Sequence, residues 1–265
     1  MTPVVDVPAT TNAAVVPTAW PRPSLATLTM VELRKMVDTR AGRWLLVVIA
    51  LACAGMAGIQ WAVNDIAVLD FETFFFGSLL PVNVLLPVLG ILTVTSEWSQ
   101  RTAQTTFTLV PVRRRVLVAK LAAGVVMAVA SVLASMVIAA AATVVAIVTG
   151  SDGGWGIDAV ALGNAVVAQV IGVIWGLAFG MMLLNTPLAI VTYFVLPMIW
   201  NILGVSVAAL ETAAQWLDTS RTLLPLMSGD TLTGQQWAQV ATSVGVWVLV
   251  PLVVGVVRVL RAEVS

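Results

Sequence analysis

Side chains that commonly carry catalytic or metal chemistry are scarce in this 265-residue chain. It has no histidine and a single cysteine, Cys53. An intrachain disulfide, the usual Cys/His metal sites and histidine-based acid–base catalysis are therefore excluded. A membrane-embedded enzyme that turns over without ATP is an alternative, but the apolar segments of this chain lack paired carboxylates and a serine–lysine pair. We expect no enzymatic activity, no metal site and no cofactor in this chain.

The segment 97–121 is the only polar segment of any length between apolar stretches on the side that we expect to be cytoplasmic. Glu97 and Arg101 are four residues apart, so both can lie on one helix face and pair. Thr102 continues that face, and Pro111 ends the helix. The basic residues that follow lead into the next apolar segment: Arg113, Arg114 and Lys120. This pattern predicts a short amphipathic helix that a cytosolic partner could push; an ordinary amphipathic connector is the alternative.

A second mixed segment precedes the first apolar stretch. Apolar residues recur there at helical spacing, and between them lie Glu32, Arg34, Lys35 and Arg40. This periodicity predicts an amphipathic helix over residues 25–43 that lies along the inner membrane surface. A basic anchor that only sets orientation is the alternative. Residues 1–24 lack the basic start and apolar block of a signal peptide, so we expect a disordered cytoplasmic tail.

The composition is that of a membrane protein. The chain is 60% hydrophobic and 10% charged, with a mean hydropathy of +1.02. Soluble domains are usually about 45–50% apolar and about 25% charged. The net charge is zero, which gives no reason to expect a nucleic-acid partner.

Six apolar segments are long enough to cross a bilayer, which takes about 20 residues. We place the spans at 44–63, 74–95, 116–148, 160–184, 188–210 and 237–257. The third is long for one crossing but too short for two, so we expect a single tilted helix. Residues 185–187 should form a tight turn between the fourth and fifth. The expected fold is an all-α polytopic membrane domain over 44–260, followed by a cytoplasmic tail at 261–265.

Charge placement predicts the orientation, because cytoplasmic loops are enriched in lysine and arginine. With six spans and both termini inside, twelve of the thirteen basic residues fall on the cytoplasmic side, and Arg221 is the exception. The twelve are Arg22, Arg34, Lys35, Arg40, Arg43, Arg101, Arg113, Arg114, Arg115, Lys120, Arg258 and Arg261. We expect Glu97 and Lys120, near the ends of their spans, to reach the membrane interface with their long side chains.

The span interiors offer few polar residues. Asn83, Pro87, Pro197 and Asn201 could line a substrate pathway, although binding of helix to helix is the commoner use of such residues. Glycines at 172, 176 and 180 form a small-residue face for packing within one chain or between two. Residues 211–236 are too polar to span, and we expect an interfacial loop. Proton- and sodium-coupled carriers generally need a charged residue deep in the membrane, and none is present here.

These motifs resemble the permeases of ABC transporters of the type-2 export class, which have the type V exporter fold. The matching positions are Glu97, Arg101, Thr102, Leu109, Pro111, Arg113, Arg114 and Lys120, together with Glu32, Lys35, Thr39 and Arg40 before the first span. The layout of six spans, an N-terminal interface helix and a coupling helix between spans two and three is also similar. The resemblance implies that Glu97, Arg101 and Thr102 belong to a gate and coupling region.

The resemblance also implies partners. Two permease subunits, identical or different, would assemble with two cytosolic ATPase subunits that bind ATP and magnesium. This chain has no phosphate-binding loop of its own. We therefore expect an ATP-driven exporter of an apolar or amphipathic substrate, such as a drug, an antimicrobial peptide or a lipid-like molecule, in a bacterial inner membrane. A membrane anchor, sensor or regulatory subunit that transports nothing is the alternative.

Overall fold

The computed structural model describes residues 23–100, 102, 108, 112–229 and 231–262, and the regular elements of these residues are all helical. The first half contains α1 (Leu25–Asp38), α2 (Arg40–Val63), the 3₁₀ turn η1 (Ile66–Val68), α3 (Phe71–Ser99) and α5 (Arg113–Val148). The second half contains α6 (Ala159–Leu183), α7 (Thr186–Ser206), η2 (Ala208–Leu210), α8 (Glu211–Leu217), α9 (Thr219–Thr222), α10 (Leu224–Met227), α11 (Gly234–Val244), the π-helical turn η3 (Gly245–Leu249) and α12 (Val250–Arg261).

Six helical segments of the described chain are long and apolar enough to cross a membrane. They are α2, α3, α5, α6, α7 and the continuous stretch Gly234–Arg261 formed by α11, η3 and α12. The prediction of an all-α chain with six such segments is confirmed. The third is one unbroken helix of 36 residues, about 54 Å long at 1.5 Å per residue, as expected from the uninterrupted apolar run.

Local capping moves two predicted boundaries. Thr39 is extended, and its hydroxyl accepts a hydrogen bond from the Gly42 amide at 3.1 Å, so α1 ends at Asp38 and α2 begins at Arg40. The helix predicted over 25–43 is therefore shorter and ends at Asp38. The expected turn between the fourth and fifth spans is present, because Leu184 is left-handed (φ 51°) and the Asn185 side chain caps α7.

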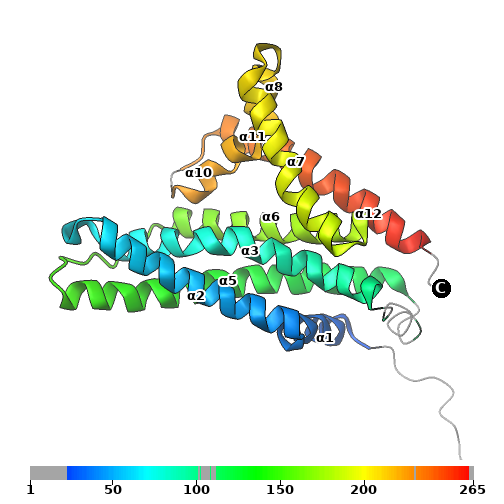
Figure 1. Ribbon diagram of the computed structural model, residues 1–265, viewed down its shortest axis with the longest axis horizontal. Coiled ribbons are helices and arrows are strands. Elements are labelled where there is room, and N and C mark those ends of the chain that lie inside the picture. The colour runs from blue at the N-terminus through cyan, green and yellow to red at the C-terminus, as the bar shows by residue number, and fades with distance from the viewer. Residues whose placement is uncertain (1–22, 101, 103–107, 109–111, 230, 263–265) are drawn as a thin grey trace, which may run out of the picture.

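The helices α3 and α6 form the centre of the molecule. Figure 1 shows α2, α3, α5 and α6 side by side, whereas α7 and α8 rise out of this group. The closest approach is at Gly176 of α6, where a Cβ atom would overlap the carbonyl oxygen of Pro87. Gly180 likewise packs against Ile91. The small-residue face of α6 therefore packs within the chain, which answers a question that the sequence left open.

The segment between α7 and α11 is folded onto the bundle. Leu226 of α10 is fully buried, and the sulfur of Met227 lies 3.7 Å from Nδ2 of Asn83 in α3. The Trp247 indole also donates to the carbonyl oxygen of Leu217 at 2.7 Å. The segment is thus more ordered than the expected interfacial loop, because its apolar residues find partners on α3, α6 and η3.

Candidate functional site

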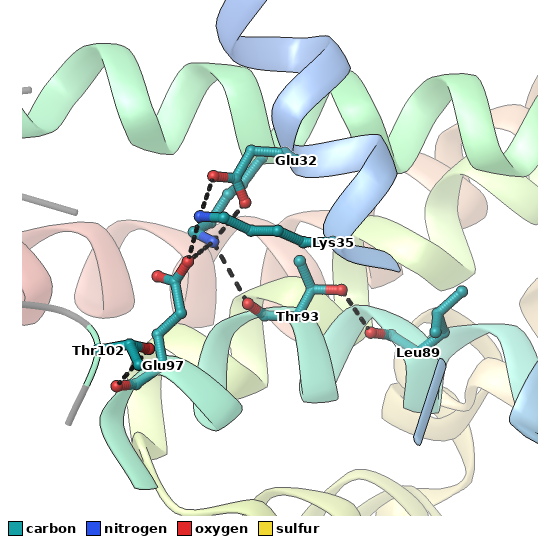
Figure 2. A network of polar contacts seen from close by, with 7 residues as sticks. Glu32, Lys35, Leu89, Thr93, Glu97 and Thr102 are labelled. Atoms are coloured by element: carbon teal, nitrogen blue, oxygen red, sulfur yellow. Dashed lines mark hydrogen bonds and ion pairs between the residues drawn. The ribbon is translucent and has the colours of Figure 1, made fainter. Parts of the chain in front are cut away.

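Four charged side chains from three helices meet at the end of the bundle where α1 joins α2 (Figure 2). We call Glu32 and Lys35 of α1, Glu97 of α3 and Lys120 of α5 the four-charge network. Lys120 Nζ lies 2.6 Å from Glu32 Oε2 and 2.9 Å from Glu97 Oε1. Lys35 Nζ lies 2.8 Å from Glu32 Oε1 and 2.8 Å from Glu97 Oε1. Each lysine therefore contacts both carboxylates.

The network is largely closed to solvent. The exposed fractions are 3% for Glu32, 7% for Glu97 and 3% for Lys120. The helix α1 covers Glu97 and Lys120, and the two side chains pair with each other. Their predicted reach to the membrane interface stays a prediction. Buried charges are tolerated only when they are paired and hydrogen-bonded, and two acids with two bases leave no net charge here.

Lys120 is fully satisfied as a donor. Besides the two carboxylates, its ammonium group donates to the carbonyl oxygen of Thr93 at 3.3 Å. An ammonium group has three donors, so all of them have an acceptor. The Thr93 hydroxyl donates to the Leu89 carbonyl oxygen at 2.7 Å, so it does not compete for Lys120 (Figure 2).

The sequence of α1 explains how Glu32 becomes buried. Leu28, Glu32 and Met36 are spaced four residues apart, share one face, and are its buried residues against α5. Ser24 fixes the start of the helix, since its hydroxyl accepts from the Thr27 amide at 3.0 Å. The periodicity of the segment predicts Glu32 among the polar residues between the apolar ones, but Glu32 is buried, and apolar Met30 and Val37 are exposed instead. The position of α1 along a membrane surface stays a prediction.

Lys35 is the outer member of the network, with about a third of its side chain exposed. Burial on its own lowers the pKa of Lys35, but the nearby carboxylates of Glu97 and Glu32 outweigh it and raise the pKa above its ordinary value. The ammonium group therefore remains charged at neutral pH. The Lys35–Glu97 pair, which joins α1 to α3, therefore persists at neutral pH.

The other residues predicted for coupling have separate positions. Arg113 donates to the carbonyl oxygens of Val259, Leu260 and Ala262 at 3.2, 3.3 and 2.7 Å, so it caps the C-terminal end of α12. The Thr102 amide donates to the Glu97 carbonyl oxygen at 2.9 Å. Arg34, Arg40 and Arg114 are exposed. Arg101, Pro111 and most of the expected coupling helix lie outside the described residues, so the Glu97–Arg101 pair stays a prediction.

The predicted pathway residues contact neighbouring elements, and their role in a substrate pathway stays a prediction. Asn83 Oδ1 accepts from Gln169 Nε2 of α6 at 2.8 Å. Asn201 Nδ2 donates to Oδ2 of Asp218 at 2.7 Å, and Asp218 is 1% exposed. Pro87 packs against Gly176, as described above, and Pro197 is half-buried within α7. Helix-to-helix binding therefore accounts for Asn83 and Asn201.

Sequence reasoning missed Gln169 and Asp218 as partners of these asparagines. A signal was present for Gln169, because it is one of two carboxamides in the otherwise apolar run of α6. Asp218 had no comparable signal, since it lies in a polar connector whose fold the sequence does not show. The interior charge of Lys120 within an apolar run was also a signal for a buried partner, but nothing in the sequence identified Glu32.

No metal site is formed by the part of the chain that the structure describes, where no three His, Cys, Asp or Glu residues are grouped suitably. Comparison of the sequence with known protein families gives no match, and comparison with curated proteins gives none either. The structure supports a helical multi-pass membrane protein, because six helices of the described residues are long and apolar enough to cross a membrane. The four-charge network is its most specific chemical feature.

Proposed function

We propose that this chain is the membrane-spanning subunit of an ATP-driven ABC exporter whose ATPase is a separate cytosolic protein. The observation that carries the proposal is the four-charge network, which joins the N-terminal helix α1 to the neighbouring ends of α3 and α5. These are the second and third spans, and the segment between them is the expected coupling element.

The network supports mechanical coupling because it resists separation of the three helices. Moving α1 away from α3 and α5 would break two ion-pair contacts at once, Lys120–Glu32 and Lys35–Glu97. It would also leave each of the four charged groups with fewer partners. A force on α1, or on the residues after Glu97, is therefore transmitted to both spans.

The distribution of charge supports an external source of energy. In the six candidate spans, α6 and α7 contain no Asp, Glu, Lys or Arg, and those of α2, α3, α5 and α12 lie toward helix ends. A proton or sodium relay would place a charged residue in the middle of a span. ATP hydrolysed by a partner supplies the energy instead.

The finer parts of the proposal follow from the sequence. The charge-free span interiors favour an apolar or amphipathic cargo, such as a hydrophobic drug, an antimicrobial peptide or a lipid-like molecule. The proposal sets both termini on the cytoplasmic side of a bacterial inner membrane, because twelve of the thirteen basic residues fall on that side in a six-span arrangement. Two permease subunits, identical or different, and two ATPase subunits form the assembly.

Gentle purification of the tagged chain from native membranes tests the proposal. A soluble ATP-binding protein at one copy per permease is the expected companion. An untagged sample controls for adventitious binding, and an unrelated membrane complex from the same extract shows that subunits survive the procedure. If that complex stays intact while no ATP-binding protein accompanies the chain, the proposal is wrong, and an anchor or sensor that transports nothing replaces it.

A further inference from the structure

A cavity of about 730 Å³ opens beside the four-charge network, between the α1–α2 junction and the last turns of α3. This volume is in the range of about 300–1,000 Å³ that is typical of small-molecule sites. Its lining includes Lys35, Arg40 and Glu97 as charged residues, and apolar residues of α3. It is a mixed site rather than a purely apolar groove.

Polarity changes in one direction along the α3 wall of this cavity. Leu89 and Leu92 lie deeper in the span and are apolar, whereas Thr93, Ser96 and Gln100 follow toward the helix end and are polar. One turn of α3 rises about 5.4 Å, so the change extends over about three turns. A ligand with a polar head at the helix end and an apolar tail directed into the span fits this order.

The charges at the polar end favour an anionic head. Glu97 is neutralised by two lysines, and Lys35 uses two of its three donors on Glu32 and Glu97. Arg40 is exposed and forms no ion pair with any residue that the structure describes. Two bases and one acid among the described lining residues leave a surplus of one positive charge at the mouth.

We propose that this cavity binds an anionic membrane lipid, with the headgroup phosphate on Arg40 and Lys35 and one acyl chain along Leu89 and Leu92. Arg40 supplies the fork of donors that matches a phosphate, and Lys35 supplies its remaining donor. This site is independent of the proposed exporter function, because it requires only that α3 lies in a bilayer.

General attraction of basic residues to an anionic membrane surface is the competing explanation. That attraction acts on every exposed base near the surface. Arg43 makes the comparison possible, because it lies in the same first turn of α2, is exposed, and does not line the cavity; its nearest carboxylate oxygen is Asp38 Oδ1 at 3.8 Å. If the cavity is a specific lipid site, loss of Arg40 weakens lipid binding more than loss of Arg43. General surface attraction predicts equal effects.

Native mass spectrometry of the purified full-length chain in detergent tests the proposal, with phosphatidylglycerol and phosphatidylcholine of identical acyl chains as probes. We expect one phosphatidylglycerol to bind in preference to phosphatidylcholine. Arg40→Gln should weaken its binding about tenfold, as for the loss of one charge-assisted contact, and Arg43→Gln should leave it unchanged. Leu92→Trp, which fills the apolar part without changing charge, should weaken binding of both lipids.

Further arms separate the possible sources of the phosphate. Inorganic phosphate at millimolar concentration should not displace phosphatidylglycerol, because it lacks the tail that occupies the apolar end. Displacement by inorganic phosphate would show a simple anion site and overturn the lipid assignment. Equal binding of the two lipids, or equal effects of Arg40→Gln and Arg43→Gln, would overturn the proposal as well.

Discussion

The ammonium group of Lys120 lies 2.6 Å from the Glu32 carboxylate, which is 88 residues away in the sequence. Both side chains are 3% exposed. This pair fixes the N-terminal helix on the third span, and Glu97 extends the connection to the second. The amphipathic helix α1 is therefore packed against the long apolar helices of the bundle.

Replacement of Lys120 by methionine should lower the free energy of unfolding by about 3–5 kcal/mol, because Glu32 and Glu97 would be left buried beside a single lysine. Lys35→Met should have a smaller effect, since about a third of the Lys35 side chain is exposed and water can solvate the remaining carboxylates. Denaturant unfolding of the purified chain in detergent, followed by tryptophan fluorescence, measures both.

A paired neutral replacement provides the control for this prediction. Glu32→Gln combined with Lys120→Met removes one acid and one base together and keeps the Lys35–Glu97 pair, so the double variant should lose less stability than the sum of the two single changes. If the double variant were as unstable as the sum of the single variants, the direct pairing would be refuted.

Gly176 tests the packing of α6 on α3. Gly176→Ala would place a Cβ atom onto the carbonyl oxygen of Pro87, so we expect a loss of about 1–3 kcal/mol from overpacking. Gly163→Ala in the same helix is the matched control, because a Cβ atom there meets nothing within 4 Å. Equal stabilities of the two variants in the same unfolding assay would contradict the close crossing.

Arg113 is expected to act as a cap for α12 rather than as a contact for a partner. Arg113→Gln should free the end of α12 and increase protease cleavage there, because three carbonyl oxygens lose a charged donor. Arg114→Gln, at an exposed neighbouring position, should leave the cleavage rate unchanged. Limited proteolysis with mapping of the C-terminal fragments shows the difference, and equal cleavage in the two variants would argue against the cap.

The spans could be predicted from the sequence because each depends on its own composition. The 116–148 run contains a single glycine and no proline, and it forms one helix. The Asn185 side chain caps the start of α7. These features depend on residues close to one another in the chain.

The network could not be predicted because it depends on contacts between distant residues. The periodicity of 25–43 placed Glu32 on a polar face, and only the docking of α1 on α5 shows that this face is buried. Asn83 and Asn201 could be recognised as unusual polar residues, but their partners Gln169 and Asp218 follow from tertiary packing.

The ATP hydrolysis rate of the purified complex shows whether the four-charge network couples a cytosolic ATPase to the spans. Glu97→Gln keeps the size of the side chain but removes the charge that holds both lysines. We predict that this variant still assembles with the ATPase at wild-type stoichiometry, while its hydrolysis rate shifts to that of the isolated ATPase subunit. A Glu97→Gln complex that assembles and hydrolyses ATP at the wild-type rate would refute the coupling role of the four-charge network.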